Sequence, residues 1–98
     1  MNNLKNNPSG QRPLDGIRVI EIGQLIAGPF AGCMLGYFGA EVIKIEPPEG
    51  DAIRNWRVLE NGTSFWWRSI GRNKKSVTLD LKKSEGQEIA RQLIERAD

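Results

Sequence analysis

The stretch RVIEIGQLIAGPFAGCMLGYFGAEVIKIE, residues 18–46, decides the fold of this chain. It opens with residues 18–22 and closes with residues 41–45, and both segments are short and rich in β-branched residues, which predicts two strands. Between them the pattern predicts a helix over residues 29–38. A strand, a helix and a strand within about thirty residues indicate a compact, Rossmann-like βαβ unit with parallel strands.

Glycine and proline mark the ends of the predicted helix. A turn bounded by two glycines, residues 23–28, follows the first strand, and Pro29 suits the first position of a helix because its missing N–H needs no partner there. Gly39 stands where the chain needs a left-handed residue to leave the helix. Both ends of the helix are therefore predicted from the sequence.

The second half of the chain is less regular. Residues 46–64 show no period and contain several prolines and glycines, so we expect a long loop that is functional or is packed by another part of the protein. Residues 65–70 are compatible with a short helix or an extended segment. Residues 76–82 alternate between apolar and polar side chains, which predicts a third strand. Ser84 is expected to begin the last helix, with Gln87 completing a capping box.

The order of these elements predicts an α/β fold with a mostly parallel sheet. We interpret residues 1–12 as a disordered tail and residues 13–98 as one domain. Because the pattern calls for a further strand after the last helix, residues 13–98 are expected to be the amino-terminal, truncated part of a larger domain.

Composition excludes several classes of function. The chain has 14 Lys and Arg against 12 Asp and Glu, so no overall field marks a nucleic-acid binder. It has no histidine, which removes a Ser-His-Asp triad and most zinc sites, and no metal site is predicted. The single Cys33, the polar first twelve residues and the lack of a long apolar run predict a cytoplasmic protein without membrane contact.

Known nucleotide-binding motifs are incomplete in this chain. Gly23 and Gly28 have the spacing of a P-loop, but Pro29 and Phe30 replace the lysine and hydroxyl that would bind phosphate and magnesium. No G-x-G sequence occurs, so nicotinamide and flavin cofactors are not supported. We interpret Gly32 and Gly36 as positions where the predicted helix packs closely on a neighbour.

Two further features leave alternatives open. The basic run at residues 72–76 is interpreted as a solvated turn before an edge strand, although its paired cations could also hold a phosphate. Trp56, Trp66 and Trp67 could stack on a base or an acyl group, but such residues more often belong to a core or a subunit interface.

Three short blocks together give the chain a family resemblance. They are Pro13-Leu14-Asp15-Gly16-Ile17; Ala27-Gly28-Pro29-Phe30-Ala31 through Gly39-Ala40-Glu41-Val42-Ile43-Lys44-Ile45-Glu46 to Gly50-Asp51; and Asn73-Lys74-Lys75-Ser76 through Leu79-Asp80-Leu81-Lys82 to Glu85-Gly86. In order and spacing, residues 13–98 resemble the family III coenzyme A (CoA) transferases.

The resemblance implies where CoA would bind. In the family the two residues before the Gly-Pro of the first turn contact CoA, and Ile26 and Ala27 match them here. The residues matching Leu79, Asp80, Leu81 and Lys82 contact the adenosine end of CoA. The sequence departs from the family at Pro47, which stands where members have a CoA-binding arginine. Arg54 also matches a family arginine, without an assigned role.

The resemblance also implies a function for the intact protein. A family III transferase moves CoA between an acyl-CoA and a carboxylic acid, uses CoA as a substrate and no separate cofactor, and forms a homodimer of two interlocked rings. Its catalytic aspartate lies beyond the last helix seen here, so this chain carries no catalytic residue. An acyl-CoA racemase of the same fold and a non-catalytic fragment are the alternatives. Small-molecule partners, and no nucleic acid or membrane, are expected.

Overall fold

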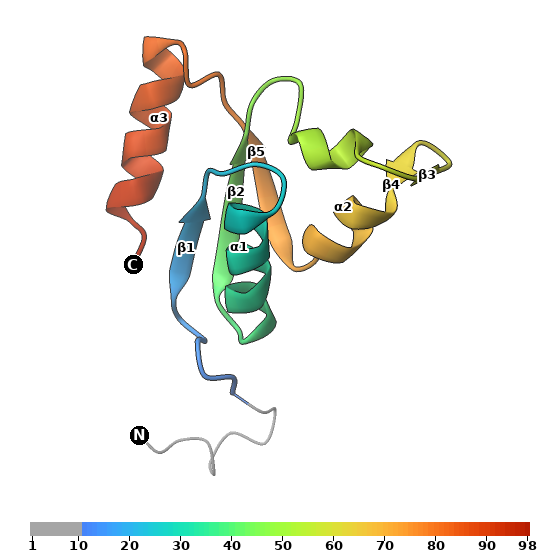
Figure 1. Cartoon of the computed structure of the whole chain (residues 1–98). Coiled ribbons are helices and arrows are strands. Elements are labelled where there is room, and N and C mark those ends of the chain that lie inside the picture. Colours follow the sequence, from blue (N-terminus) through green and yellow to red (C-terminus); the bar gives the residue numbers. More distant parts are fainter. Residues whose placement is uncertain (1–10) are drawn as a thin grey trace.

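A parallel sheet forms the centre of the computed structural model, which describes residues 11–98 (Figure 1). Its strands are β1 (Arg18–Glu21), β2 (Glu41–Glu46) and β5 (Lys74–Thr78), in the order β1-β2-β5. Both pairings are parallel, with Ile20 opposite Ile43 and Ile45 opposite Val77. The predicted βαβ unit and the parallel α/β fold are therefore confirmed.

Helix α1 (Ala27–Tyr37) connects the first two strands. It begins two residues before the predicted start, since the Phe30 N–H already donates to the Ile26 carbonyl at 2.7 Å and Pro29 occupies a later position in the first turn. Any position in that turn tolerates a missing N–H. Gly39 has φ +113°, which confirms the predicted left-handed exit.

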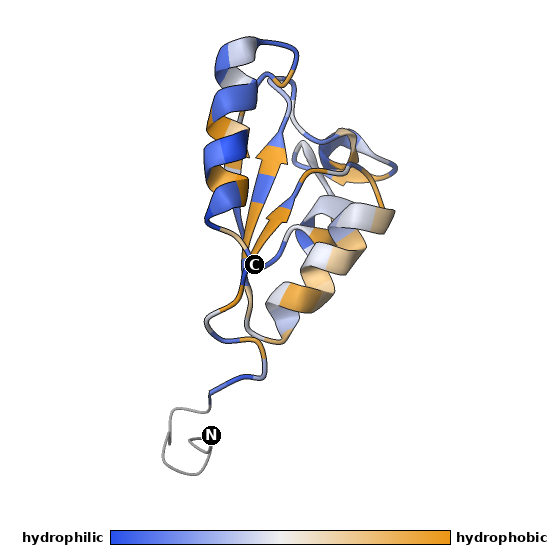
Figure 2. Ribbon diagram, turned by 90° about the vertical axis from the view of Figure 1, so that its left-hand side faces the viewer, coloured by the Kyte–Doolittle hydropathy of each residue, from blue (hydrophilic) through white to orange (hydrophobic). Residues whose placement is uncertain are grey.

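The sheet lies between helices on its two faces. Figure 2 shows it nearly edge-on, with α3 (Ser84–Glu95) on one side and α1 on the other. The α3 side is apolar: its buried cluster consists of Ile45, Leu79 and Ala90, with Ile20, Val77, Leu81 and Leu93 packed against it. The alternate apolar residues after residue 76 thus share one face, as the alternation predicted.

The bounds of the predicted third strand and the cap of the last helix are wrong in detail, although that helix begins at Ser84 as predicted. The third strand runs from Lys74 to Thr78, so residues 79–82 lie beyond it in a loop. The ladder between β2 and β5 ends here because the Leu79 N–H donates to the carbonyl of Glu46, the last residue of β2. The residues that follow β2 are prolines, which have no N–H to continue the ladder. The predicted capping box is also absent: Lys83 is the N-cap, without a side-chain hydrogen bond, and the Gln87 amide donates to the Leu81 carbonyl instead.

The predicted long loop folds into a small lobe of its own. It contains a 3₁₀ helix, η1 (Ala52–Asn55), and a hairpin of β3 (Leu59–Glu60) and β4 (Thr63–Ser64), followed by α2 (Phe65–Ile70). Residues 65–70 are therefore helical, with the Ser64 hydroxyl accepting from two N–H groups of the first turn.

Aromatic side chains fill this lobe. The rings of Trp56 and Trp66 lie 5.3 Å apart, and the Arg54 guanidinium lies 3.8 Å from the ring centroid of Trp67. Trp66 nonetheless stays 39% exposed, and Phe65 is 47% exposed. The tryptophans thus pack the lobe, and the lobe also presents an apolar outer surface.

Most of the predicted disordered tail, residues 1–12, lies outside the described residues and stays a prediction. Arg12, at its end, donates a backbone hydrogen bond to the Asp15 carboxylate at 2.8 Å. Within residues 11–98 no helix is long and apolar enough to cross a bilayer. The same range holds no cluster of side chains suited to a metal ion.

Candidate functional site

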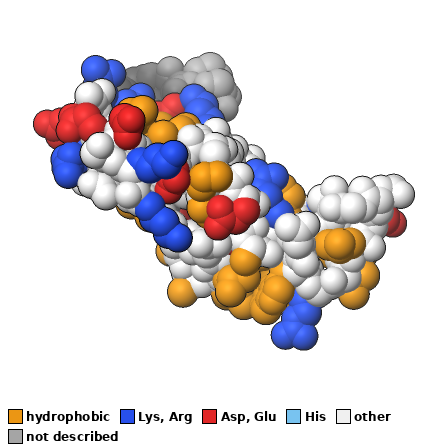
Figure 3. Space-filling view, turned by 90° about the horizontal axis from the view of Figure 1, so that it is seen from above, with side chains coloured by type: hydrophobic (Ala, Val, Ile, Leu, Met, Phe, Trp, Pro, Cys, Tyr) orange, Lys and Arg blue, Asp and Glu red, His pale blue; other side chains and the backbone are white. Residues whose placement is uncertain are grey.

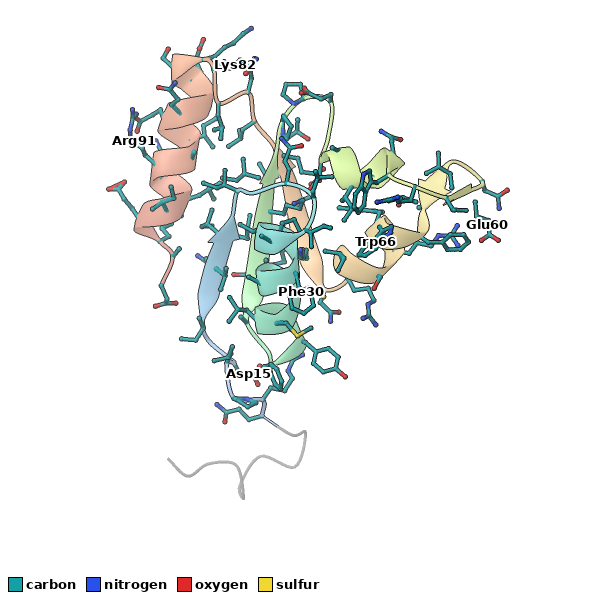
Figure 4. All side chains as sticks on the ribbon, in the orientation of Figure 1. Asp15, Phe30, Glu60, Trp66, Lys82 and Arg91 are labelled. Atoms are coloured by element: carbon teal, nitrogen blue, oxygen red, sulfur yellow. The ribbon has the colours of Figure 1, made fainter. Side chains whose placement is uncertain are left out.

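A cleft of about 320 Å³ opens at the carboxyl ends of the strands, where open α/β sheets bind ligands. Its walls come from the end of β2 and from the loops after all three sheet strands: Ile22 and Gln24 after β1, Ile45 within β2 with Pro47, Pro48 and Glu49 after it, and Leu79, Asp80, Leu81 and Lys82 after β5. All four residues of the last group were predicted to contact CoA. Figure 4 shows Lys82 at this end of the molecule, opposite to Asp15.

The other predicted contacts, Ile26 and Ala27, do not line this cleft. They lie at the start of α1, Ile26 as its N-cap and Ala27 as its first residue, and both are exposed, Ile26 to 41%. The turn that carries them also carries Gln24, which does line the cleft. The structure therefore places both predicted groups at the carboxyl edge of the sheet without joining them in one pocket.

Local hydrogen bonds fix the loop of residues 79–82. One carboxylate oxygen of Asp80 accepts the Lys82 backbone N–H at 3.0 Å, and the Asp80 carbonyl accepts from Lys83 at 3.1 Å. The Asp80 side chain thus shapes the turn. The Lys82 ammonium makes no ion pair within residues 11–98, and the side chain is exposed, so it can bind an external anion.

Charges of both signs share this edge of the molecule. Figure 3, viewed from above onto the carboxyl edge, shows acidic and basic side chains intermixed on one part of the surface and apolar side chains gathered on another. In the cleft, Lys82 is accompanied by Glu49 and Asp80. A ligand here would meet an apolar floor with a few polar groups, which is typical of small-molecule sites.

Below this edge, under α1, the sheet buries ions. The ammonium of Lys44 lies 2.6 Å from a carboxylate oxygen of Glu21 and 2.6 Å from one of Asp51, and it donates to the Gly23 carbonyl at 3.2 Å. All three ionic side chains are at most 3% exposed. Such a group is stable only when each charge has partners, as here.

A second buried lysine completes this cluster. Lys74 lies 2.7 Å from the other Glu21 oxygen and donates to the Pro29 carbonyl at 2.7 Å, with its side chain 2% exposed. Neither interpretation of the basic run fits Lys74, which is neither solvated nor free for phosphate. Lys75 is exposed and pairs with Glu41 at 2.6 Å, as the solvated-turn interpretation predicts.

Glu46 anchors the lobe to the sheet. Both its carboxylate oxygens bind the Arg54 guanidinium at 2.7 Å, and it also accepts from Ser76 and from the Asp51 N–H. Arg54, whose family match had no assigned role, is thus half of a bidentate ion pair. These contacts, the one with Arg54 first, lower the pKa of Glu46 to about 2, against the opposing effect of burial.

The pKa values of Lys44 and Asp51 follow from the same competition between burial and bonded partners. Burial works to lower the pKa of Lys44, but its bonds to Asp51 and Glu21 outweigh burial, so the pKa lies above its usual value. Burial works to raise the pKa of Asp51, but hydrogen bonds from Ile53 and Leu25 and the Lys44 ammonium hold it below its usual value. Lys44 and Asp51 therefore both stay ionised near neutral pH.

Acid should weaken the fold through Glu46. Its folded pKa, about 2, is below the ordinary 4.5, so its stabilisation is complete above pH 4.5 and is lost as the pH falls toward 2. We expect the free energy of unfolding, measured by urea titration at several pH values, to fall more steeply over this window in the parent than in Glu46→Gln. Equal slopes for the two proteins would contradict this assignment.

Sequence reasoning missed this ionic layer, although two signals point to it. Lys44 and Glu46 occupy alternate positions of β2, on either side of the apolar Ile45, so they share the α1 face. Gly32 then lets α1 approach: a Cβ there would lie 2.0 Å from a Glu21 oxygen, and one at Gly36 would lie 3.3 Å from Val42. The predicted close packing at these two glycines is confirmed.

The fold and the cleft define an α/β protein with a candidate ligand site at the carboxyl edge of a parallel sheet. Residues 14–98 match the model of CoA-transferase family III, and the chain belongs to this family. The family resemblance found in the sequence is thus confirmed.

Several relatives in the family are named as CoA-transferases. Over 89 residues the chain is 51% identical to the succinyl-CoA–D-citramalate CoA-transferase of Chloroflexus aurantiacus, covering 89% of this chain and 22% of the relative. It is 42% identical over 99 residues to the succinate–glutarate CoA-transferase of Agrobacterium fabrum, covering 93% and 25%. The human succinyl-CoA:glutarate CoA-transferase is 40% identical over 100 residues, covering 100% and 21%.

Solved structures share the fold of this chain. A CaiB/BaiF family protein from Brucella suis superposes with a TM-score of 0.82 at 39% identity, covering 90% of this chain and 25% of that protein. A hypothetical protein from Mycobacterium tuberculosis gives a TM-score of 0.80 at 40% identity, covering 89% and 24%. The chain thus spans about a fifth to a quarter of the length of these relatives.

Proposed function

We propose that the intact protein is a CoA-transferase that moves CoA between an acyl-CoA and a carboxylic acid, and that residues 11–98 supply part of its CoA site. One observation carries the proposal. The four consecutive residues that match the family's adenosine contacts, 79–82, line the cleft at the carboxyl edge of the sheet. CoA is then a substrate, and the proposal includes no further cofactor.

Acids within the described residues do not supply the nucleophile in this proposal. The buried carboxylates of Glu21, Glu46 and Asp51 are all held in ion pairs, which opposes attack on a thioester. The transferase chemistry requires a carboxylate that attacks the acyl carbon and expels the CoA thiolate, giving a mixed anhydride. The thiolate then attacks the enzyme's carbonyl of that anhydride, which releases the donor acid and leaves an enzyme-bound CoA thioester. The family resemblance places that aspartate outside this chain.

The activity itself is tested with the intact protein. Three of the relatives are named for succinyl-CoA or succinate together with citramalate or glutarate, so succinyl-CoA is the first donor to try, with a panel of dicarboxylate acceptors. We expect new CoA esters that appear only when an acceptor is present. Racemisation of a branched acyl-CoA without any acceptor would overturn the transferase proposal in favour of the racemase alternative.

Lys82→Ala should weaken CoA binding in the intact protein. The substitution removes one charge-assisted contact at an exposed site, so we expect a dissociation constant about tenfold higher with unchanged folding. Isothermal titration with CoA gives the affinity and thermal unfolding checks the fold. Repeating the titration with dephospho-CoA locates the contact, since a partner of the 3′-phosphate loses its effect when that phosphate is absent.

The neighbouring Lys83→Ala is the matched control for Lys82. Lys83 is also an exposed cation, but it does not line the cleft. We expect its affinity for CoA to stay close to that of the parent. If both variants bind as the parent does, Lys82 is a solvated charge and the family's contact does not carry over.

The proposal extends to assembly and location. Several large apolar side chains of α1 and the lobe are exposed, among them Phe30 at 50%, Tyr37 at 59% and Val58 at 65%, which supports a homodimer that covers some of them. The interlocked-ring form of that dimer rests on the family resemblance. A cytoplasmic location fits the free thiol of the buried Cys33. Light scattering and cell fractionation test the two statements.

A further inference from the structure

We propose that Asp51 is a positioning residue for CoA: it ties the turn after β1 to the loop after β2 and so sets the shape of the cleft. The inference rests on the proposed CoA site. Asp51 touches no part of the cleft itself, since it is fully buried and absent from the cleft walls. It acts through the backbone of the residues that form them.

The turn after β1 needs an external restraint. Leu25 has φ +65°, a left-handed conformation that residues with a side chain rarely adopt. Its N–H donates to a carboxylate oxygen of Asp51 at 3.0 Å. On either side of Leu25 lie Gln24, which lines the cleft, and Ile26, which matches a CoA contact of the family. A shift of this turn would therefore move both.

Two more contacts make the same connection. Lys44 bridges the Gly23 carbonyl and the second oxygen of Asp51. The Gln24 side chain accepts the Ala52 N–H at 3.1 Å. The first turn and the loop of residues 47–52 are thus joined at three successive positions, and these two segments form adjacent walls of the cleft.

Asp51 has a second, local role that a test must separate. The oxygen that accepts from Leu25 also accepts the Ile53 N–H at 2.9 Å, which caps η1. Its charge also balances Lys44. A substitution that loses the cap or leaves Lys44 without a carboxylate would affect folding whether or not the turn matters for CoA.

Two double variants isolate the contact with Leu25. Lys44→Met/Asp51→Asn and Lys44→Met/Asp51→Ser both remove one positive and one negative charge, so Glu21 and Lys74 remain as a balanced pair. Asparagine and serine both cap helices well. Asparagine keeps an oxygen where it can accept from Leu25, whereas the serine side chain is one atom shorter and loses that contact.

We expect the asparagine variant to bind CoA more tightly than the serine variant, by about tenfold for one lost buried hydrogen bond and the turn it holds. In turnover, the serine variant should raise KM for the acyl-CoA and leave kcat unchanged, because only substrate binding is affected. A purely structural role would lower the melting temperature without this split. Equal affinity and equal KM for two folded variants would overturn the inference.

Amide hydrogen exchange in the unsubstituted intact protein keeps the inference testable if a variant fails to fold. The Leu25 amide should exchange as slowly as amides of β2, and much more slowly than Gly62 at the hairpin tip. Fast exchange at Leu25 would overturn the inference.

The two proposals can fail separately. If the parent protein binds no CoA, the proposed function is wrong. If the parent binds CoA and the two variants bind it with equal affinity, only the role of Asp51 is contradicted.

Discussion

Lys44→Met should unfold the domain or leave it barely stable. The substitution keeps most of the side-chain volume but removes the ammonium that lies between Glu21 and Asp51, both of which are buried. Breaking a buried ion pair from one side costs about 3–5 kcal/mol. A small domain has a total stability on the order of 5–15 kcal/mol, so this is a large fraction. Chemical denaturation followed by circular dichroism measures the loss.

Lys75→Met is the matched control for this experiment. Lys75 also belongs to the sheet and pairs with a glutamate at the same 2.6 Å, but its side chain is 72% exposed. An exposed pair contributes little because water and salt screen it. Similar unfolding curves for Lys44→Met and Lys75→Met would show that the buried cluster does not stabilise the fold.

Gly86→Ala should destabilise the protein and weaken CoA binding together. A Cβ at this position would lie 2.1 Å from the backbone oxygen of Asp80, so either α3 or the loop of residues 79–82 must move. Alanine would ordinarily favour a helix over glycine by about 1 kcal/mol. The clash with a backbone atom is expected to outweigh that gain and to cost about 1–3 kcal/mol net.

Denaturation and CoA titration of the intact protein measure the two effects of Gly86→Ala. Glu95→Ala, at the far end of the same helix, is the control and should leave both properties nearly unchanged. A Gly86→Ala protein that is as stable as the parent, or more stable, would mean that helix propensity dominates and that α3 does not need this close approach.

The sheet could be predicted from residue patterns because its strands obey them. The β-branched strands flank a helix with readable ends, and the apolar alternation around Val77 faces the core as expected. The end of β5 could not be predicted from that alternation alone. It depends on the partner strand β2, after which Pro47 and Pro48 end the ladder. Which strands pair is set by the tertiary structure, so the alternation within one strand does not show it.

The hairpin in the lobe was missed although its signal is present. Asn61 and Gly62 have φ +52° and +79°, the two left-handed positions that an Asn-Gly hairpin turn requires. The lack of a period over residues 46–64 predicts only a long loop there. The flanking strands have two residues each, too few for alternation to show.

The candidate site, too, could be predicted from the sequence only in part. The cleft residues 79–82 are identified by family resemblance, since their alternation alone predicts only part of a strand. The ions beneath the cleft were missed because lysine, glutamate and aspartate are normally assigned to the surface. Only the three-dimensional pairing of Glu21 with Lys44 and Lys74 shows why these charges are buried.

The ionic layer under α1 affects how the stability of the protein changes on heating. Hydration of charged groups becomes less favourable as temperature rises, so the cost of keeping ions away from water falls on warming. The apolar contacts under α3 do not gain in the same way. As the protein approaches its melting temperature, the layer built on Lys44 therefore carries a growing share of the stability, and α1 and the turn before it should be among the last parts to loosen.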